Sequence, residues 1–308
     1  MKKVFKFLLV FIVAAVAGGG TGFLLKKLIA DPIITYDNVD FFSLTPDYDA
    51  IFNKVDSYKG SEPKIDAFST SDILNYSMEK FRREETSSNY TVGYSDTGVV
   101  WQDIRGCCIK NGNEVFEESI SKSKKATINI NIEVGNRMYS KGKGQDITMY
   151  TANKNSVSIL DDGTDAIYSE SAFEVYKEDA YKQKFGKTIY EMFIVLICPQ
   201  SILSDEIKTT STGYEITVDV DKDIGTYFDK LQMKNISNLD RYPVFKDMKV
   251  TFTLDTNLNL KKMHIDEHYT ATKMVEAKAH SIIDIYYYAN DNLAIPGLND
   301  RVIYKLGD

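Results

Sequence analysis

The sequence contains few cysteines, prolines and glycines: three, six and 18 among 308 residues. Such low proline and glycine counts exclude a collagen-like chain. An odd and low number of cysteines excludes a disulfide scaffold, and no C-x-x-C spacing supports a zinc or redox site. Beyond the first 30 residues there is no long apolar run, which excludes a membrane protein with several spans.

The three cysteines are Cys107, Cys108 and Cys198. Adjacent cysteines rarely form a disulfide with each other, because the small ring strains the peptide bond between them. Cys198 follows the apolar run 193–197 and is expected to be a buried thiol that packs like a small hydrophobic side chain. A single disulfide from Cys107 or Cys108 to Cys198 is the alternative.

A basic excess is also missing. The chain has 37 Lys+Arg against 44 Asp+Glu, a formal charge of −7, which argues against a nucleic-acid-binding protein. Its 43% of hydrophobic residues is ordinary for a globular protein and excludes a wholly disordered chain. The charge is uneven: residues 1–30 contain five lysines and no acid, so residues 31–308 carry −12. Bulk charge should therefore attract neither nucleic acid nor anionic lipid headgroups to that part.

One apolar run stands near the N-terminus, where Thr21 is the only polar residue from Phe7 to Leu25. As a helix this run would measure roughly 28 Å, close to the ~30 Å hydrocarbon core of a bilayer. More lysines precede it than follow it, which favours a cytoplasmic N-terminus. We expect residues 1–27 to be a single-pass anchor that contacts the membrane through residues 7–25. The alternative is a signal peptide cleaved after Ala15-Val16-Ala17, which also exports the rest.

Residues 28–66 are then expected to be a membrane-proximal segment and residues 67–308 an extracytoplasmic domain. A helix is predicted over residues 70–84, because Ser69, Thr70 or Ser71 can cap it and an apolar stripe follows at helical spacing. Further helices are predicted after Thr45-Pro46, over residues 170–185, over Ile189–Leu196 and over Ile224–Met233.

Elsewhere the apolar residues recur at every second position. The strictest alternation joins Ile128, Ile130, Ile132 and Val134. Ser95–Gly98 and Asn111–Asn113 are predicted to be hairpin turns between such segments. Alternation of this kind indicates strands with one buried and one wet face, as in an antiparallel sheet. We therefore predict an α+β fold with one large antiparallel sheet packed with helices, preceded by one N-terminal transmembrane helix.

The order of elements from Ser71 to Asn290 resembles the lipoprotein-carrier fold of bacterial cell envelopes. The resemblance is carried by Ile73–Phe81 leading to Asn89–Val92, and by the closing pair Val250–Leu254 and Leu260–Tyr269. The closing section also resembles uncharacterised membrane-anchored proteins of Gram-positive bacteria. The resemblance implies a curved antiparallel sheet that wraps around helices and can hold an acyl chain.

No string of residues predicts a catalytic centre, a metal site or a cofactor. The most metal-like string is His264-Ile265-Asp266-Glu267-His268. On a strand, at ~3.3 Å per residue, its two histidines stand roughly 13 Å apart, too far to share one ion. They are expected on the solvent face, with Glu267 on the other face, and the isolated His280 is expected to be structural.

Tyrosine is the aromatic residue in excess, with 20 copies beside 16 phenylalanines. Its amphipathic ring suits an apolar wall close to water, such as a ligand cleft. We therefore predict a non-enzymatic binding module for a hydrophobic or lipid-like ligand. A structural or protein-interaction protein of the envelope without a cavity is the alternative, and an enzyme of wall or polymer metabolism is a third option. The residues expected to line the cleft are Tyr90, Val92, Trp101, Ile128, Ile130, Ile132, Phe252, Tyr269, Ile285 and Tyr287.

Overall fold

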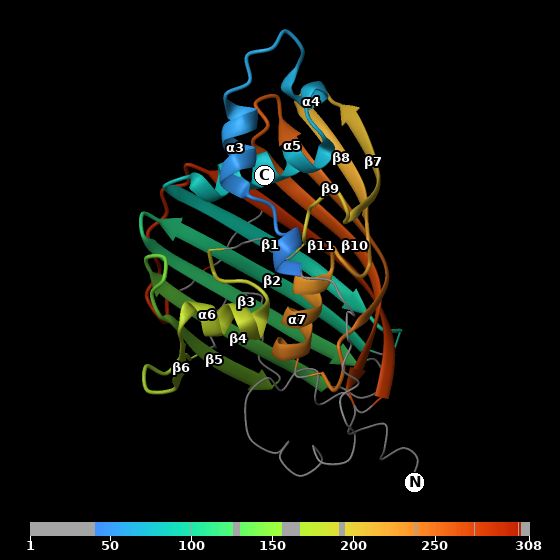
Figure 1. Cartoon of the computed structure of the whole chain (residues 1–308). Helices are drawn as coiled ribbons and strands as arrows, with labels where there is room; N and C mark the ends of the chain where they lie inside the picture. The colour runs from blue at the N-terminus through green and yellow to red at the C-terminus, as the bar shows by residue number, and fades with distance from the viewer. Residues whose placement is uncertain are drawn as a thin grey trace.

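The computed structural model describes residues 41–98, 100–125, 130–155, 167–190, 195–237, 239–273, 275–300 and 302. In these residues eleven strands form one antiparallel sheet, and helices lie against one of its faces (Figure 1). The strands are β1 (Thr86–Asp96), β2 (Val100–Asn111), β3 (Glu114–Lys125), β4 (Ile130–Lys141), β5 (Ile147–Asn155), β6 (Phe173–Tyr176), β7 (Ile202–Thr209), β8 (Gly213–Val220), β9 (Val244–Asp255), β10 (Leu260–Lys273) and β11 (Val275–Ala289). The helices are α2 (Phe41–Leu44), α3 (Tyr48–Asp56), α4 (Lys64–Ala67), α5 (Thr70–Arg83), α6 (Glu178–Phe185) and α7 (Tyr227–Ile236).

The sheet consists of two meanders joined at their first and last strands. Its order is β6-β5-β4-β3-β2-β1-β11-β10-β9-β8-β7, so every neighbouring pair except β1 and β11 is adjacent in sequence. Along the central β1–β11 ladder, Ser87 pairs with Ala289 and Asp96 pairs with His280. This ladder joins the two halves of the chain into one continuous sheet.

Helix α5 is the main helix on the sheet. Ser69 caps it by accepting a hydrogen bond from the Asp72 amide at 3.2 Å, and basic residues occupy its last turn, where they favour the helix dipole. Its apolar face enters a core with the inward side chains of β8 to β11, including the fully buried Phe252. Helix α3 packs against α5, and its cap is Asp47, which directly follows Thr45-Pro46.

The two sides of the sheet differ in what covers them. We call the side that faces α5, α6 and α7 the helix face. On the other side, residues 290–300 cross the β1–β4 strands: Leu293 and Ile295 pack against Tyr90, and Asn111 Nδ2 donates to the Leu293 carbonyl at 2.8 Å. We call this side the tail face. Its β9–β11 part carries mostly polar side chains.

The predicted α+β class is wrong, because the described residues are mostly β. The six described helices have only four to 14 residues, whereas the strands reach 15 residues and share one sheet. Part of the predicted helix over 170–185 is strand β6, and the helix begins at Glu178. Of the predicted helix Ile189–Leu196, residues 189–190 and 195–196 are turn or coil and residues 191–194 lie outside the described residues. Ile189, Val195 and Leu196 are apolar because the tertiary fold buries them, which periodicity alone does not distinguish from helix formation. The apolar residues Phe173 and Val175 of β6 are instead about half exposed on a strand.

The predicted membrane segment, residues 7–25, lies outside the described residues. Among the residues that the structure does describe, none of the helices combines the length and the apolar character that a membrane span requires.

Candidate functional site

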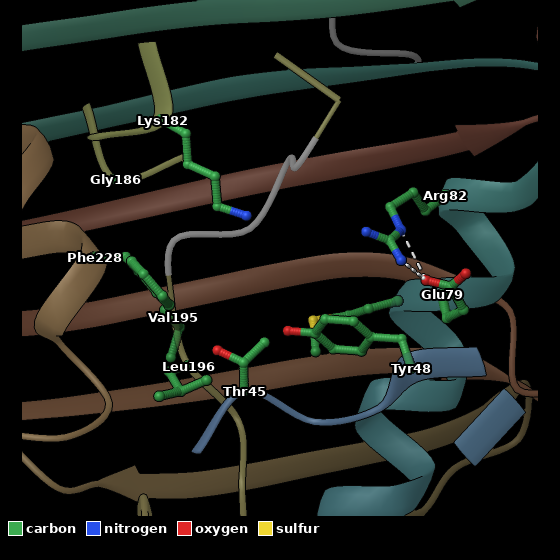
Figure 2. A pocket seen from close by; sticks show the side chains of 10 residues that line it. Thr45, Tyr48, Glu79, Arg82, Lys182, Gly186, Val195, Leu196 and Phe228 are labelled. Atoms are coloured by element: carbon green, nitrogen blue, oxygen red, sulfur yellow. Dashed lines mark hydrogen bonds and ion pairs between the residues drawn. The ribbon is translucent and has the colours of Figure 1, made fainter. Parts of the chain in front are cut away.

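A pocket lies on the helix face between α5, α6 and α7. Its volume is about 310 Å³. We call it the helix-face pocket, and Figure 2 shows its side chains converging from separate stretches of the chain. The lining residues are Thr45, Tyr48, Met78, Glu79, Arg82, Lys182, Gly186, Val195, Leu196 and Phe228.

The backbone of the loop before β7 is tied to two helix-face elements, and this fixes the apolar wall of the pocket. The Leu196 amide donates to the Gly225 carbonyl at 3.0 Å, just ahead of α7. Asn75, buried in α5, donates through its side-chain amide to the Ile197 carbonyl at 2.9 Å. Both bonds satisfy backbone groups of a buried loop, which would otherwise be costly to bury. They place Val195 and Leu196 against the pocket.

The C-terminal end of α6 forms the facing wall. Gly186 ends this helix in the left-handed conformation, with φ of 78°, and its amide donates to the Lys182 carbonyl at 2.8 Å. A Cβ atom at Gly186 would stand 2.5 Å from the Phe228 carbonyl oxygen, so only glycine permits this approach of α6 to α7. In Figure 2 the Lys182 side chain extends from this wall into the space between the elements.

The polar edge of the pocket is an ion pair within α5. Glu79 is buried, and its carboxylate accepts hydrogen bonds from Arg82 Nε at 2.7 Å and Arg83 Nε at 2.8 Å. The Arg82 guanidinium also lies over the Tyr48 ring, 5.1 Å from its centroid. Arg83 shares the same carboxylate but does not line the pocket. Arg83 also forms an ion pair with Asp49 of α3, so its charge is balanced there. Among the described lining residues the charged groups are Arg82, Lys182 and Glu79, which gives the pocket a net positive charge.

The pocket therefore combines an apolar wall with cationic groups. Met78, Val195, Leu196 and Phe228 provide the apolar surface, and Arg82 and Lys182 provide donors for an anion. Glu79 is the single carboxylate among the described lining residues, and both of its oxygens are held by arginines. Chemically, this arrangement can orient an amphipathic molecule by one charged end.

A buried pair of acidic residues lies between α7 and the sheet. Asp229 of α7 and Glu267 of β10 are both almost fully buried and share a hydrogen bond. Burial raises the pKa of Asp229 to about 7 and raises the pKa of Glu267 well above its usual value, the latter also because Asp229 is close. Ser281 and Tyr269 continue this network, with Ser281 Oγ 3.2 Å from the Tyr269 hydroxyl.

The predicted cleft residues lie on both faces of the sheet and do not line the helix-face pocket. Phe252 and Tyr287 are buried in the core beneath α5, with Tyr269 and Ile285 packed against that core. Tyr90 and Val92 lie on the tail face, in the cluster that Leu293 and Ile295 cover, and Trp101 is 52% exposed. Ile128, and the side chains of Ile130 and Ile132, are outside the described residues.

No sequence pattern marks the pocket residues. Arg82 stands in the last turn of α5, where a cation favours the helix dipole, and Lys182 belongs to no motif. Because the pocket joins residues from Thr45 to Phe228, no local motif could have revealed it. Cys198 is a free and buried thiol, as expected, and so are Cys107 and Cys108, so the alternative disulfide is not formed.

Comparisons with known proteins give little further guidance. No protein-family model and no curated protein matches the chain. One similar solved structure is that of a DUF1329 family protein from Desulfovibrio piger, with 11% sequence identity. The alignment covers 73% of this chain and 93% of that chain with a TM-score of 0.26, and a score this low supports no argument about fold or function.

Proposed function

We propose that the protein is a non-enzymatic binding module for a small amphipathic ligand with an apolar body and an anionic end. The observation that carries this proposal is the helix-face pocket, in which Arg82 and Lys182 stand beside an apolar wall. A charge-assisted hydrogen bond from Arg82 would fix the anionic end, while Leu196 and Phe228 would cover the apolar body.

The volume of the pocket limits the size of this ligand. About 310 Å³ is near the lower end of the usual range for small-molecule sites. This supports a single short acyl chain or a molecule of similar size and argues against a lipid with two long chains. The predicted attachment to a membrane through residues 7–25 stays a prediction, and it would place such a module beside a source of amphiphiles.

The test is calorimetric titration of the full-length chain with three soluble ligands that share one apolar body: octanoate, octanol and octylamine. An amphipathic polymer should keep the chain in solution, because detergent would compete for the pocket. We expect octanoate to bind most tightly and octylamine most weakly, since the pocket is cationic. Equal affinities for the three, or no binding of octanoate, would refute the proposal.

A matched pair of variants tests the site itself. Arg82→Gln and Arg83→Gln each remove one guanidinium from Glu79, but only Arg82 lines the pocket. We expect Arg82→Gln to weaken octanoate binding about tenfold, because a hydrogen bond to a charged group contributes roughly 1.5–3 kcal/mol. Arg83→Gln should leave the affinity unchanged. An equal loss in both variants would show that the effect comes from Glu79 and the fold of α5.

The edge strand β7 favours a second candidate, a protein-interaction role. Leu203 is 66% exposed and Ile207 is 40% exposed on this strand, which pairs with β8 alone among the strands that the structure describes. An unpaired strand edge with apolar side chains can accept an extended segment of another protein. Substituting both residues with lysine should abolish a strand-mediated complex, whereas it should leave octanoate binding unchanged.

A further inference from the structure

Every histidine of the chain lies on the tail face of the hairpin formed by β10 and β11. Each of the three rings contacts one aspartate through a ring nitrogen. The pairs are His264 Nδ1 with Asp284 Oδ1 at 2.7 Å, His268 Nδ1 with Asp247 Oδ1 at 2.7 Å, and His280 Nε2 with Asp266 Oδ1 at 2.8 Å.

Two of these pairs are brought together by the register of the hairpin. His268 of β10 stands directly opposite His280 of β11, and their rings stack with centroids 4.2 Å apart and planes 5° from parallel. Asp266, two residues before His268, projects from the same face of β10. One ligand atom from each of these three residues lies within 4.8 Å of the others.

We propose that Asp266, His268 and His280 bind a divalent transition-metal ion such as Zn²⁺. Two imidazoles and a carboxylate form a ligand set suited to Zn²⁺, and to Cu²⁺ or Ni²⁺, rather than to Ca²⁺ or Mg²⁺. Three protein ligands leave the fourth position of a tetrahedral Zn²⁺ ion for water. The three side chains are about two-fifths exposed, so both the ion and this water can reach the site.

The two imidazole rings must turn to bind one ion, because a metal bond lies in the plane of its ring and the two planes are now nearly parallel. Bonds of about 2.0–2.1 Å in a tetrahedron place neighbouring ligand atoms about 3.3 Å apart. The contact between His280 Nε2 and Asp266 Oδ1, now 2.8 Å, would open by about half an ångström as the ion replaces the shared proton. The separations of up to 4.8 Å would close by side-chain rotation, without a change in the strand register.

A further carboxylate already orients one of the ligands. Asp247 of β9 holds Nδ1 of His268 at 2.7 Å, which leaves Nε2 of that ring for the ion. A carboxylate on the second nitrogen of a ligating histidine is the usual arrangement in zinc sites, because it fixes the ring and increases its basicity. Asp96 of β1 pairs in register with His280, and it adds negative charge to the same row.

This site is independent of the proposed ligand-binding function. The helix-face pocket lies on one side of the sheet, and the histidines lie on the other. A chain that does not bind Zn²⁺ should therefore still bind octanoate at the helix-face pocket. Likewise, a chain that does not bind octanoate should still bind Zn²⁺ at the histidines.

The test is titration of the full-length chain, carrying no histidine tag, with Zn²⁺ by calorimetry and with Co²⁺ by visible absorption. We expect one ion per chain and a Co²⁺ spectrum typical of tetrahedral coordination. His268→Gln and His280→Gln should each weaken Zn²⁺ binding at least tenfold. Asp247→Asn should weaken it by about 10- to 100-fold, as for other residues that orient metal ligands.

His264→Gln is the matched control. Like His268, His264 lies on the tail face of β10 and contacts an aspartate through Nδ1, but it lies outside the cluster. This variant should bind Zn²⁺ as tightly as the unmodified chain. All variants should unfold at the same temperature without metal, since the substituted side chains are partly exposed. The absence of saturable binding at one ion per chain, or an equal loss of affinity in His264→Gln, would overturn the proposal.

Discussion

The buried acidic pair predicts an unusual dependence of stability on pH. Asp229 and Glu267 both have a higher pKa in the folded protein than in the unfolded chain, because burial disfavours their charged forms. The folded state therefore binds their protons more tightly. The stability that this provides is complete below the unfolded pKa values and is lost as the pH rises through the folded ones.

The size of this pH dependence follows from the number of protons that the folded pair retains after the unfolded chain has released them. A pKa of about 7 instead of 3.8 at Asp229 corresponds to a free-energy difference of about 4 kcal/mol. At pH 5 the folded pair keeps protons that the unfolded chain has largely released. Each retained proton should lower the free energy of unfolding by about 1 kcal/mol for every unit by which the pH rises.

Glu267→Gln tests this reasoning, because glutamine has nearly the same shape as the protonated acid and cannot ionise. Only one proton-binding site then remains, so the pH dependence from the pair should become weaker. In urea unfolding at pH 5, 6 and 7, the variant should match the unmodified chain at pH 5. It should be more stable than the unmodified chain at pH 7, by about 1 kcal/mol for each pH unit over which Glu267 retains its proton.

The exposed Glu215 of β8 provides the control, since Glu215→Gln makes the same chemical change in contact with water. The difference between that variant and the unmodified chain should not vary with pH. If the advantage of Glu267→Gln were the same at pH 5 and pH 7, the pair would not retain its protons and the reasoning would be wrong.

Three further predictions concern the core, a buried ion pair and a cysteine. Phe252→Ala should lower the free energy of unfolding, measured in urea, by about 3–5 kcal/mol, because it leaves a cavity at a fully buried position. Trp101→Ala, at a position that is 52% exposed, should change the same quantity by less than about 1 kcal/mol. Arg137→Met should lower the free energy of unfolding by about 3–5 kcal/mol in the same assay, because it leaves the buried Glu118 carboxylate without the ion-pair partner 2.8 Å away. The double variant Arg137→Met with Glu118→Leu should recover most of that loss, because it removes the unpaired charge. Cys108 should resist thiol-labelling reagents in the native protein and react once urea unfolds it, because burial raises its pKa and limits access; rapid labelling without urea would contradict this.

Local signals predicted several elements well. The cap residue and apolar stripe located α5, which begins within one residue of the predicted start and ends at Arg83. The turn predicted at Ser95–Gly98 lies between β1 and β2. These elements depend on residues close in sequence, so propensity and periodicity are sufficient to locate them.

Features that depend on tertiary contacts could be predicted only in part. Glu267 was noted as an acid on the apolar side of its strand, and this was the signal of the buried pair. Its partner Asp229 lies on another element, so the sequence offered no means of pairing them. An acidic residue at an apolar position of an alternating strand is thus worth treating as a prediction of a buried polar partner.

The histidine cluster shows the same limit for a site. The sequence predicted correctly that His264 and His268 lie on a strand and are too far apart to share an ion. It did not reveal that His280 stands opposite His268, because this depends on the register of β10 against β11. No glycine, proline, asparagine or aspartate marks the connection between Lys273 and Val275, so the sequence contains no turn signal from which this register could be predicted.

The seam between β1 and β11 has a consequence for how the chain acquires its structure. Residues paired along this seam, such as Ser87 and Ala289, are about 200 positions apart, whereas the other strand pairs join neighbours in sequence. The two meanders can therefore form early and separately. Pairing β1 with β11 requires the closure of a loop of about 200 residues, which costs conformational entropy, so this step should limit the folding rate. Until then both seam strands present unpaired edges. At high concentration, β11 of one molecule can pair with β1 of another, so refolding should yield exchanged dimers in proportion to protein concentration.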